Sequence, residues 1–460
     1  MPVETVSPTE DIGNQSRAER VSMSAYKELL ELVHSSQVEI VHILSTPRSS
    51  STALERALFQ SDDVHLQIND AWANHDSDSR EQATYQQILF EIKEELKEKE
   101  KIKVIVKSVA DYIPPGESFE RMCELSSHTI VLTRNPLLQM ESMMRIMGES
   151  IESDRILVGG LTMNEYSQSL GYDNWQDMRT KVNQTKSYYK YEPIYSAFFP
   201  IEQEIHKSAV MRLPILHNLQ ESVINTIGYG TKDDYASSHG FVDWQHFLDS
   251  IDRNPDSIND HGELIRAIFL CRITGWDAML QHVVQLENSN YHHTVIDSTM
   301  FRAKPEYYLE QLARRAGLAY GESVVNWSVS HKQFNPGDDE GVSYYQKVIE
   351  SSGVQPPNEV PMVLNHFPTF IQNHLSENGG AFSTYLKLLE KHIHEFGEEQ
   401  TRDLMKVVID GVSLQDIDPV FVYAMLKVMN MGDASQFKEK YPQYREEFNL
   451  IDRLEEKNNE

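Results

Sequence analysis

The sequence predicts an α/β protein, a mainly parallel β-sheet flanked by helices, with a helical extension at its C-terminal end. Runs of β-branched and apolar residues recur along the chain, as in strands that are buried on both faces of a parallel sheet. Helical patterns separate most of these runs, as they do in strand–helix–strand units. Beyond residue 356 only helical patterns remain.

The predicted elements follow one another in a regular order. A leading helix begins at Ser24, and the first core strand spans 38–46, where VEIVHILST is almost continuously apolar or β-branched. Further strands are expected over 64–69, 102–109, 128–133 and 293–300. The main helices between and after them are expected over 53–59, 85–101, 136–147, 263–287 and 305–318.

These elements divide the chain into three parts. Residues 1–36 hold a polar N-terminus, expected to be disordered to about residue 20, and the leading helix. Residues 37–355 form the α/β domain, in which the stretch 148–260 has no clean period and is assigned loosely to helices and substrate-facing loops. Residues 356–460 form the helical region, with helical patterns over 382–396, 400–412 and 419–431 and a charged tail from 451.

Composition limits the function classes. A formal net charge of −28 disfavours binding to nucleic acid or to an anionic membrane, and it makes a cationic acceptor or partner more plausible. The two cysteines, Cys123 and Cys271, lie far apart and outside any metal-ligand spacing, so no metal site is expected. No run of 18 apolar residues occurs and the N-terminus is polar and acidic, so we expect a cytoplasmic protein. The oligomeric state is left open.

A polar loop, Thr46 to Thr52, follows the first strand and opens directly into a helix. At such a place unpaired backbone N–H groups and the positive end of the helix dipole face the carboxyl end of a buried strand, which favours an anion. Arg48 adds a charge, and Ser49, Ser50, Ser51 and Thr52 add hydroxyl donors. The alternative is that these hydroxyls only cap the helix. The lysine of a kinase-type phosphate loop is absent, so nucleoside-triphosphate hydrolysis is disfavoured.

The loop STPRSSSTALERAL, from Ser45, resembles a loop of the sulfotransferases that use 3′-phosphoadenosine 5′-phosphosulfate, especially a bacterial branch with a TPRSGST-like loop. The likeness runs in order from Val38 to about Gly353, and it implies a P-loop-like sulfotransferase fold. It also implies that Arg48 stands where the family has a catalytic Lys or Arg. Ser49, Ser51 and Thr52 would then bind the 5′-phosphosulfate.

A second element of the family is an Arg at the end of a later strand with a Ser eight residues on, which together hold the 3′-phosphate. The segment VLTRNPLLQMES supplies Arg134 and Ser142 at this spacing. A chain reversal can bring both to one phosphate, since Ser142 lies about two turns into the following helix. Alternatively, Arg134 is an ordinary ion-pairing residue and Ser142 a solvent-facing helix position. Two later stretches, 293–327 and 343–356, also resemble the family and bear on the fold rather than on the site.

Sulfuryl transfer also requires a group that takes the proton of the acceptor. Asp70, which follows the second strand, is the leading candidate because the resembling branch has an acidic residue about there, and His75 is the second. Lys107 falls at the end of a strand where the family often has a functional lysine. The alternatives are a polar loop of turn formers for Asp70 and His75, and a solvent-reaching lysine for Lys107. Asp111 and Tyr112 are weaker candidates.

Three departures from the family pattern bear on the donor site. Ser50 occupies the usual glycine position of the loop, so a positive φ there would be strained. Ser108 stands where the branch tends to have Asp. No Arg-Lys-Gly segment grips the 3′-phosphate late in the chain; His331 and Lys332 could replace it, or could belong to a solvated loop.

The resemblance implies a sulfotransferase that acts on a hydroxyl or an amine of a small metabolite, with 3′-phosphoadenosine 5′-phosphosulfate as co-substrate. A non-catalytic binding or scaffold protein on a degenerate sulfotransferase fold, and a phosphate-group transferase, are the alternatives. The acceptor is not readable from the sequence. Aromatic residues could line its pocket or belong to the core, namely Tyr188, Tyr189, Tyr191, Phe198 and Phe199.

Overall fold

The computed structural model confirms the α/β class with helices at the C-terminal end. It describes residues 24–72, 80–150, 157–194, 214–217, 219–334, 342–376, 380–404, 408–409, 412–431 and 434–459. The chain divides into two compact units, each built from several segments. The first unit comprises 1–45, 50–132 and 281–355, and the second comprises 46–49, 133–280 and 356–460. Residues 133–280 thus group with the C-terminal helices, whereas the sequence assigned 37–355 to one domain.

A five-stranded parallel sheet organises the first unit. Its order is β2 (Leu66–Ile68), β3 (Ile102–Val109), β1 (Val38–Ser45), β4 (Ser126–Thr133) and β7 (His293–Asp297). The central strands are almost entirely buried, which explains their near-continuous apolar runs. The chain leaves β1 for β2 on one side of the sheet and later enters β4 on the other. The carboxyl end of β1 is therefore a topological switch point, where open parallel sheets bind ligands.

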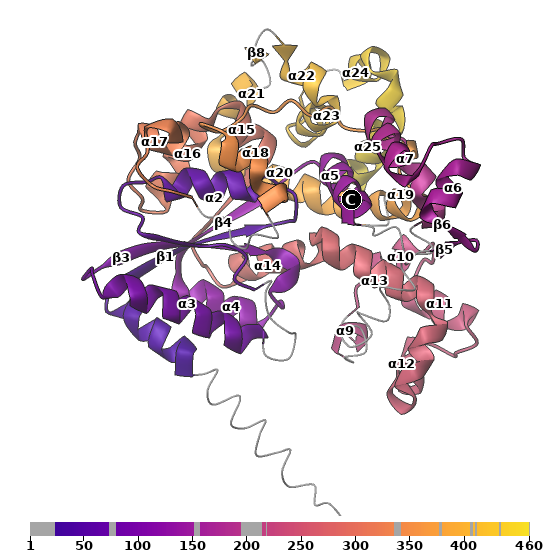
Figure 1. Ribbon diagram of the computed structural model, residues 1–460, viewed down its shortest axis with the longest axis horizontal. Helices are drawn as coiled ribbons and strands as arrows, with labels where there is room; N and C mark the ends of the chain where they lie inside the picture. The colour runs from indigo at the N-terminus through magenta and orange to yellow at the C-terminus, as the bar shows by residue number, and fades with distance from the viewer. Residues whose placement is uncertain are drawn as a thin grey trace, which may run out of the picture. The chain divides into compact units, whose positions relative to one another are not determined.

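Helices cover both faces of this sheet (Figure 1). Helix α2 (Ser51–Phe59) lies on one face and packs against β3, and α16 (Pro305–Arg315), α17 (Glu322–Val325) and α18 (Val342–Glu350) pack against α2. Helices α3 (Arg80–Leu96) and α4 (Glu117–Leu125) lie on the opposite face. The leading helix, residues 24–34, is present as expected from its apolar spacing.

Two boundaries in the later part of the chain differ from the sequence expectation. The helix expected over 263–287 is two helices, α13 (Gly262–Thr274) and α14 (Trp276–Asn288). They are separated by Gly275, whose φ of +70° lies in the left-handed region that favours glycine. The strand expected over 293–300 ends at Asp297, because the Asp297 carboxylate accepts bonds from the Thr299 and Met300 amides and begins helix α15 (Ser298–Ala303).

Two details of the C-terminal region also differ from the sequence expectation. Residues 400–412 were expected to be helical, but α21 (Glu398–Leu404) is followed by the antiparallel pair β8 (Val408–Ile409) and β9 (Val412–Ser413), where β-branched residues favour extended backbone. The charged tail from 451 belongs to α25 (Arg445–Asn459). Its buried Phe448, Ile451 and Leu454 recur at helical spacing, a pattern that the surrounding charges hide.

Where the structure describes the aperiodic stretch 148–260, the chain forms largely short capped helices. Asn174, Thr231 and Asp243 begin three of them by accepting a backbone amide bond through their side chains. Tyr188 and Tyr191 are fully buried and their rings pack edge to face, so they belong to the core, whereas Tyr189 is exposed. Phe198 and Phe199 lie outside the described residues. The helices and strands here are β5 (Leu157–Val158), β6 (Leu161–Thr162), α6 (Met163–Ser169), α7 (Trp175–Thr185), α9 (Pro214–His217), α10 (Glu221–Thr226), α11 (Lys232–Ser238) and α12 (Trp244–Arg253).

A buried polar pair connects two helix starts in the second unit. The Asn135 side-chain amide donates to both carboxylate oxygens of Asp418, at 3.0 and 3.1 Å, and its carbonyl accepts from the Leu137 amide at the start of α5 (Pro136–Ser150). Asp418 also accepts from the Phe421 amide and so caps α23 (Pro419–Val428). The remaining helices of this unit are α19 (Thr369–Leu375), α20 (Ala381–Phe396), α22 (Leu414–Ile417) and α24 (Ala434–Lys440). No helix in the described ranges has both the length and the apolar character that crossing a bilayer requires.

We expect Asp418→Ala to lower the free energy of unfolding by about 2–4 kcal/mol, because it removes a helix cap and leaves the buried Asn135 amide without its acceptor. Asp243→Ala is the matched control: this exposed carboxylate caps α12 through the His246 amide, and its loss costs about 1 kcal/mol. Chemical denaturation of the two variants measures the difference. Equal losses would contradict the role of the buried pair.

Candidate functional site

The loop between β1 and α2 has a strained backbone. Arg48 has a φ of +60° and Ser50 a φ of +70°, both in the left-handed region. A residue with a Cβ costs about 1–2 kcal/mol in this conformation, which explains why glycine suits position 50 in the loop that this one resembles. The strain expected at Ser50 is therefore present.

The hydroxyls of the loop do not cap α2 in the way that the capping alternative requires. Ser50 is the N-cap residue, yet its side chain makes no capping bond, and the first turn of α2 holds no acidic residue. The Ser49 hydroxyl donates to the Thr46 carbonyl at 2.7 Å, within the loop itself. The positive end of the α2 dipole thus has no carboxylate in its first turn to offset it, as an anion site requires.

Two residues that are distant in sequence contact Arg48 within the second unit. The Arg48 Nε donates to the Ser142 hydroxyl at 3.2 Å, and the Arg134 Nη1 donates to the Arg48 carbonyl at 2.8 Å. The Arg134 side chain is 8% exposed, and its Nη2 lies 3.7 Å from a carboxylate oxygen of Glu359. The sequence paired Arg134 with Ser142; in the structure Arg48 contacts both.

A buried cluster of charges lies at the strand ends of the first unit. The Lys107 Nζ lies 3.2 Å from the Asp70 Oδ2, 3.8 Å from the Glu55 Oε2 and 3.4 Å from the Thr52 hydroxyl. The Lys107 side chain is only 3% exposed, so it is not a solvent-reaching lysine. The two carboxylates raise its pKa against the opposing effect of burial. The structure therefore brings together Asp70, Lys107 and the loop residue Thr52.

Glu55 is a member of this cluster that the sequence analysis did not single out. Its side chain is fully buried, and among the described residues neither carboxylate oxygen accepts a hydrogen bond. Burial raises the pKa of Glu55 to about 8, although Lys107 acts in the opposite direction. Its position in the sequence could have indicated that it is buried near the loop. Glu55 follows Ser51 by four residues, on the face of α2 that also buries Leu54 and Leu58.

Tyr345 of α18 is a second member that the sequence analysis did not single out. Its hydroxyl donates to the Asp70 Oδ2 at 3.4 Å, and its ring centroid lies 5.8 Å from the Lys107 Nζ. Arg56 of α2 anchors α18 by donating to the Val348 carbonyl. Asp70 itself has a φ of +46°, a third left-handed residue at these strand ends. The stretch 343–356, used above only as fold evidence, thus supplies a residue of the cluster.

Lys332 does not lie at the loop. Its ammonium donates to the carbonyls of Phe59 at 3.1 Å, of Val64 at 2.6 Å and of Ser61, and so it satisfies the C-terminal end of α2. A nine-residue helix spans about 13 Å. Lys332 is therefore at the end of α2 opposite the loop, and this position does not favour the alternative in which it replaces the missing 3′-phosphate segment. His331 is exposed.

Ser108 and His75, two further residues named from the sequence, are not among the contacts described above. Ser108 is fully buried in β3, and among the described residues its hydroxyl has no hydrogen-bond partner. His75 lies outside the described residues, so its candidacy stays a prediction. In the described ranges no three His, Cys, Asp or Glu side chains gather in a way that could hold a metal ion.

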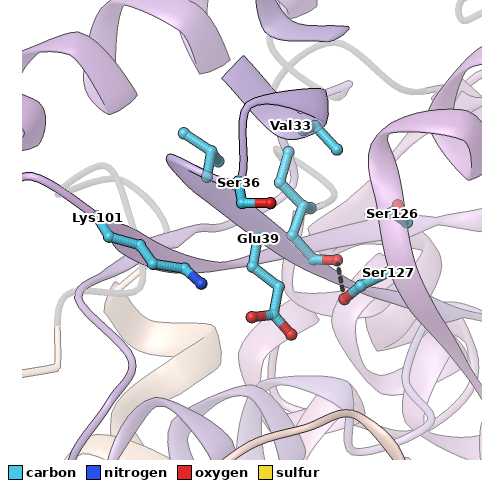
Figure 2. A pocket seen from close by; sticks show the side chains of 8 residues that line it. Val33, Ser36, Glu39, Lys101, Ser126 and Ser127 are labelled. Carbon is cyan, nitrogen blue, oxygen red and sulfur yellow. Dashed lines mark hydrogen bonds between the residues drawn. The ribbon is translucent and has the colours of Figure 1, made fainter. Parts of the chain in front are cut away.

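A hollow at the opposite ends of the strands, where they begin, is a poorer candidate for a site. It is lined at the start of β1 and β4 and by Lys101, just before β3 (Figure 2). Its Ser127 hydroxyl already donates to the Ile40 carbonyl at 3.0 Å, and Glu39 lies 3.6 Å from the Lys103 ammonium. Ligands of parallel sheets bind at the carboxyl ends of the strands, and this hollow is at the amino ends.

Comparisons with protein-family models, curated proteins and solved structures found no match for this chain.

We expect Glu55→Gln to change how stability depends on pH. Because the folded-state pKa of Glu55 is about 8 and its ordinary value is 4.5, its contribution to stability is complete below about pH 4.5 and is lost as the pH rises through 8. Glutamine stays neutral, so the variant should gain stability relative to the wild type between pH 5 and 8, by an amount on the order of a few kcal/mol. Chemical denaturation at several pH values measures this difference.

Glu91→Gln is the control for that measurement. Burial raises the pKa of Glu91 on α3 as well, but this carboxylate is only half-buried and accepts a bond from Gln87. Its replacement should give a smaller change. A Glu55→Gln difference that stays constant from pH 5 to 8 would contradict a neutral, buried Glu55.

Proposed function

We propose that this protein is a sulfotransferase that moves a sulfuryl group from 3′-phosphoadenosine 5′-phosphosulfate to a hydroxyl or an amine of a small metabolite. One observation carries the proposal: Arg134 and Ser142, which the resemblance assigns to the 3′-phosphate, both bond to Arg48, which it assigns to the phosphosulfate. These residues are separated from Arg48 by 86 and 94 positions in sequence. Their convergence on the loop is what a site for a doubly phosphorylated nucleotide would need.

The chemistry follows from charge and position. The bond between sulfur and the bridging phosphate oxygen breaks as the acceptor oxygen or nitrogen bonds to sulfur, and negative charge builds on the bridging oxygen. Arg48, which the resemblance assigns to the phosphosulfate, neutralises that charge, as fixed donors do in phosphoryl transfer. The acceptor proton passes to Asp70, whose carboxylate Lys107 and Tyr345 hold in place. The products are the sulfated acceptor and 3′-phosphoadenosine 5′-phosphate.

The net charge of −28 bears on the acceptor. An acidic protein surface attracts cations at long range and repels anions. Within this proposal, a cationic amine or an amino alcohol is therefore the first class of acceptor to assay with labelled donor.

We expect 3′-phosphoadenosine 5′-phosphate at millimolar concentration to raise the melting temperature by about 3 °C or more, because a ligand of the folded state stabilises it by mass action. Arg48→Ala and Arg134→Ala should abolish the rise, each measured against its own unliganded midpoint. Arg402→Ala is the control, since that exposed arginine pairs with Glu398 on α21. A thermal-shift assay is sufficient.

The same assay tests the alternatives. Absence of any shift at millimolar ligand would overturn the donor-site proposal and favour a binding or scaffold protein. A magnesium-dependent response to ATP, without a response to the adenosine bisphosphate, would favour a phosphate-group transferase.

We expect Asp70→Asn to separate binding from chemistry. The variant should keep the thermal shift given by the bisphosphate but lose roughly 10²–10⁴-fold in the rate of sulfuryl transfer, the usual contribution of a general base. Transfer of labelled sulfate to a panel of small amines and alcohols measures the rate. If Asp70→Asn transfers as fast as the wild type, Asp70 is not the base, and His75 becomes the next residue to replace.

A further inference from the structure

Lys107 links the buried charge cluster to the loop. Its ammonium lies 3.4 Å from the hydroxyl of Thr52, the second residue of α2, and 3.2 Å from the Asp70 carboxylate. An anion bound at the first turn of α2 is therefore in reach of the field of this ammonium. The strength of that field depends on how many carboxylates offset the charge of Lys107.

Two carboxyl groups flank the one ammonium, and their surroundings differ. The Asp70 side chain is 19% exposed and makes the shorter contact with Lys107. The Glu55 side chain is fully buried, lies 3.8 Å from the ammonium and accepts no hydrogen bond among the described residues. A buried carboxyl that lacks hydrogen-bond donors favours its neutral form. Asp70 is thus the main ion-pair partner of Lys107, and Glu55 offsets the charge of Lys107 only when it loses its proton.

We propose that Glu55 is a proton-linked regulator of anion binding at the start of α2. With its proton, Glu55 leaves Lys107 offset by one carboxylate, and the ammonium attracts an anion. Without its proton, Glu55 places a second negative charge beside Lys107 and weakens that attraction. The inference rests on the donor site proposed above and adds to it a residue that need not touch the donor.

Two titratable groups beside Glu55, Lys107 and Tyr345, keep their protons in the relevant range. Glu55 is faced by Lys107 from β3, by Asp70 from the segment after β2 and by Tyr345 from α18. The pKa values of Lys107 and Tyr345 are both raised above their ordinary values, so both groups keep their protons between pH 7.5 and about 9.5. Glu55, with a pKa of about 8, changes charge in this range.

The test is isothermal titration calorimetry, which measures the affinity of each ligand at pH 7.5, 8.5 and 9.5 and constant ionic strength. The proteins compared are the wild type, Glu55→Gln and the control Glu91→Gln. The ligands are inorganic sulfate and 3′-phosphoadenosine 5′-phosphate, because sulfate carries the same charge throughout this range. We expect the affinity of the wild type for both ligands to fall roughly tenfold from pH 7.5 to 9.5, and that of Glu55→Gln to change less than twofold. Glu91→Gln should behave like the wild type.

A second measurement needs no variant. Binding an anion favours the protonated form of Glu55, so the wild type should take up part of a proton per ligand near pH 8. Titrations in two buffers with different ionisation enthalpies measure this uptake. If Glu55→Gln does not fold, the uptake still decides the question.

The outcomes separate this inference from the proposed function. If sulfate binds with the expected fall in affinity from pH 7.5 to 9.5 but the bisphosphate does not bind, the proposed donor is overturned and the role of Glu55 is supported. Binding of both ligands with the same pH profile in wild type and Glu55→Gln, and without proton uptake, would overturn the role of Glu55 and leave the donor standing. Failure of both ligands to bind at every pH would overturn both.

Discussion

The parallel pairing of β1 with β3 on one side and β4 on the other is the constraint on which the site depends. It places Ile43 beside Lys107 and Ser45 beside Leu132, so the carboxyl ends of three strands stand at one edge of the sheet. The loop from Thr46 begins at that edge, and Asp70 follows β2 there. Residues that are far apart in sequence meet because parallel strands all end on the same side.

Burying the charge of Lys107 imposes a second condition on the first unit. An ammonium with 3% of its side chain exposed is tolerated only beside opposite charge and hydrogen-bond acceptors. Asp70 meets this condition in a left-handed backbone conformation, with Tyr345 bonded to the same carboxylate oxygen. Arg48 and Ser50 are strained in the same way. Such strain costs about 1–3 kcal/mol per residue, persists only where surrounding contacts enforce it, and gathers at functional sites.

The sequence predicted the parts of this arrangement that depend on local pattern. The apolar runs located the strands, and Asp70 and Lys107 were each placed near the end of a strand, although the contact between them was not predicted. Glu55 and Tyr345 could not be found in this way, because Glu55 reads as an ordinary charge in a short helix and Tyr345 reaches Asp70 across 275 positions of sequence. The position of Lys332 could not be predicted from the sequence pattern either. A basic residue gives the same sequence signal whether it contacts a phosphate or, as here, the carbonyls at the end of α2.

A purely structural role explains this cluster poorly. Replacing a buried ion pair by well-packed apolar residues is often neutral or stabilising, so a chain selected for stability alone gains little from Glu55, Lys107 and Asp70 together. Here a fully buried carboxyl that accepts no hydrogen bond from the described part of the chain lies beside the ammonium, a feature that lowers stability at neutral pH. Local features that oppose stability are expected where function requires them. Because Lys107 also contacts Thr52 of the loop, the function that best accounts for this cost is control of the charge that an anion meets at the start of α2.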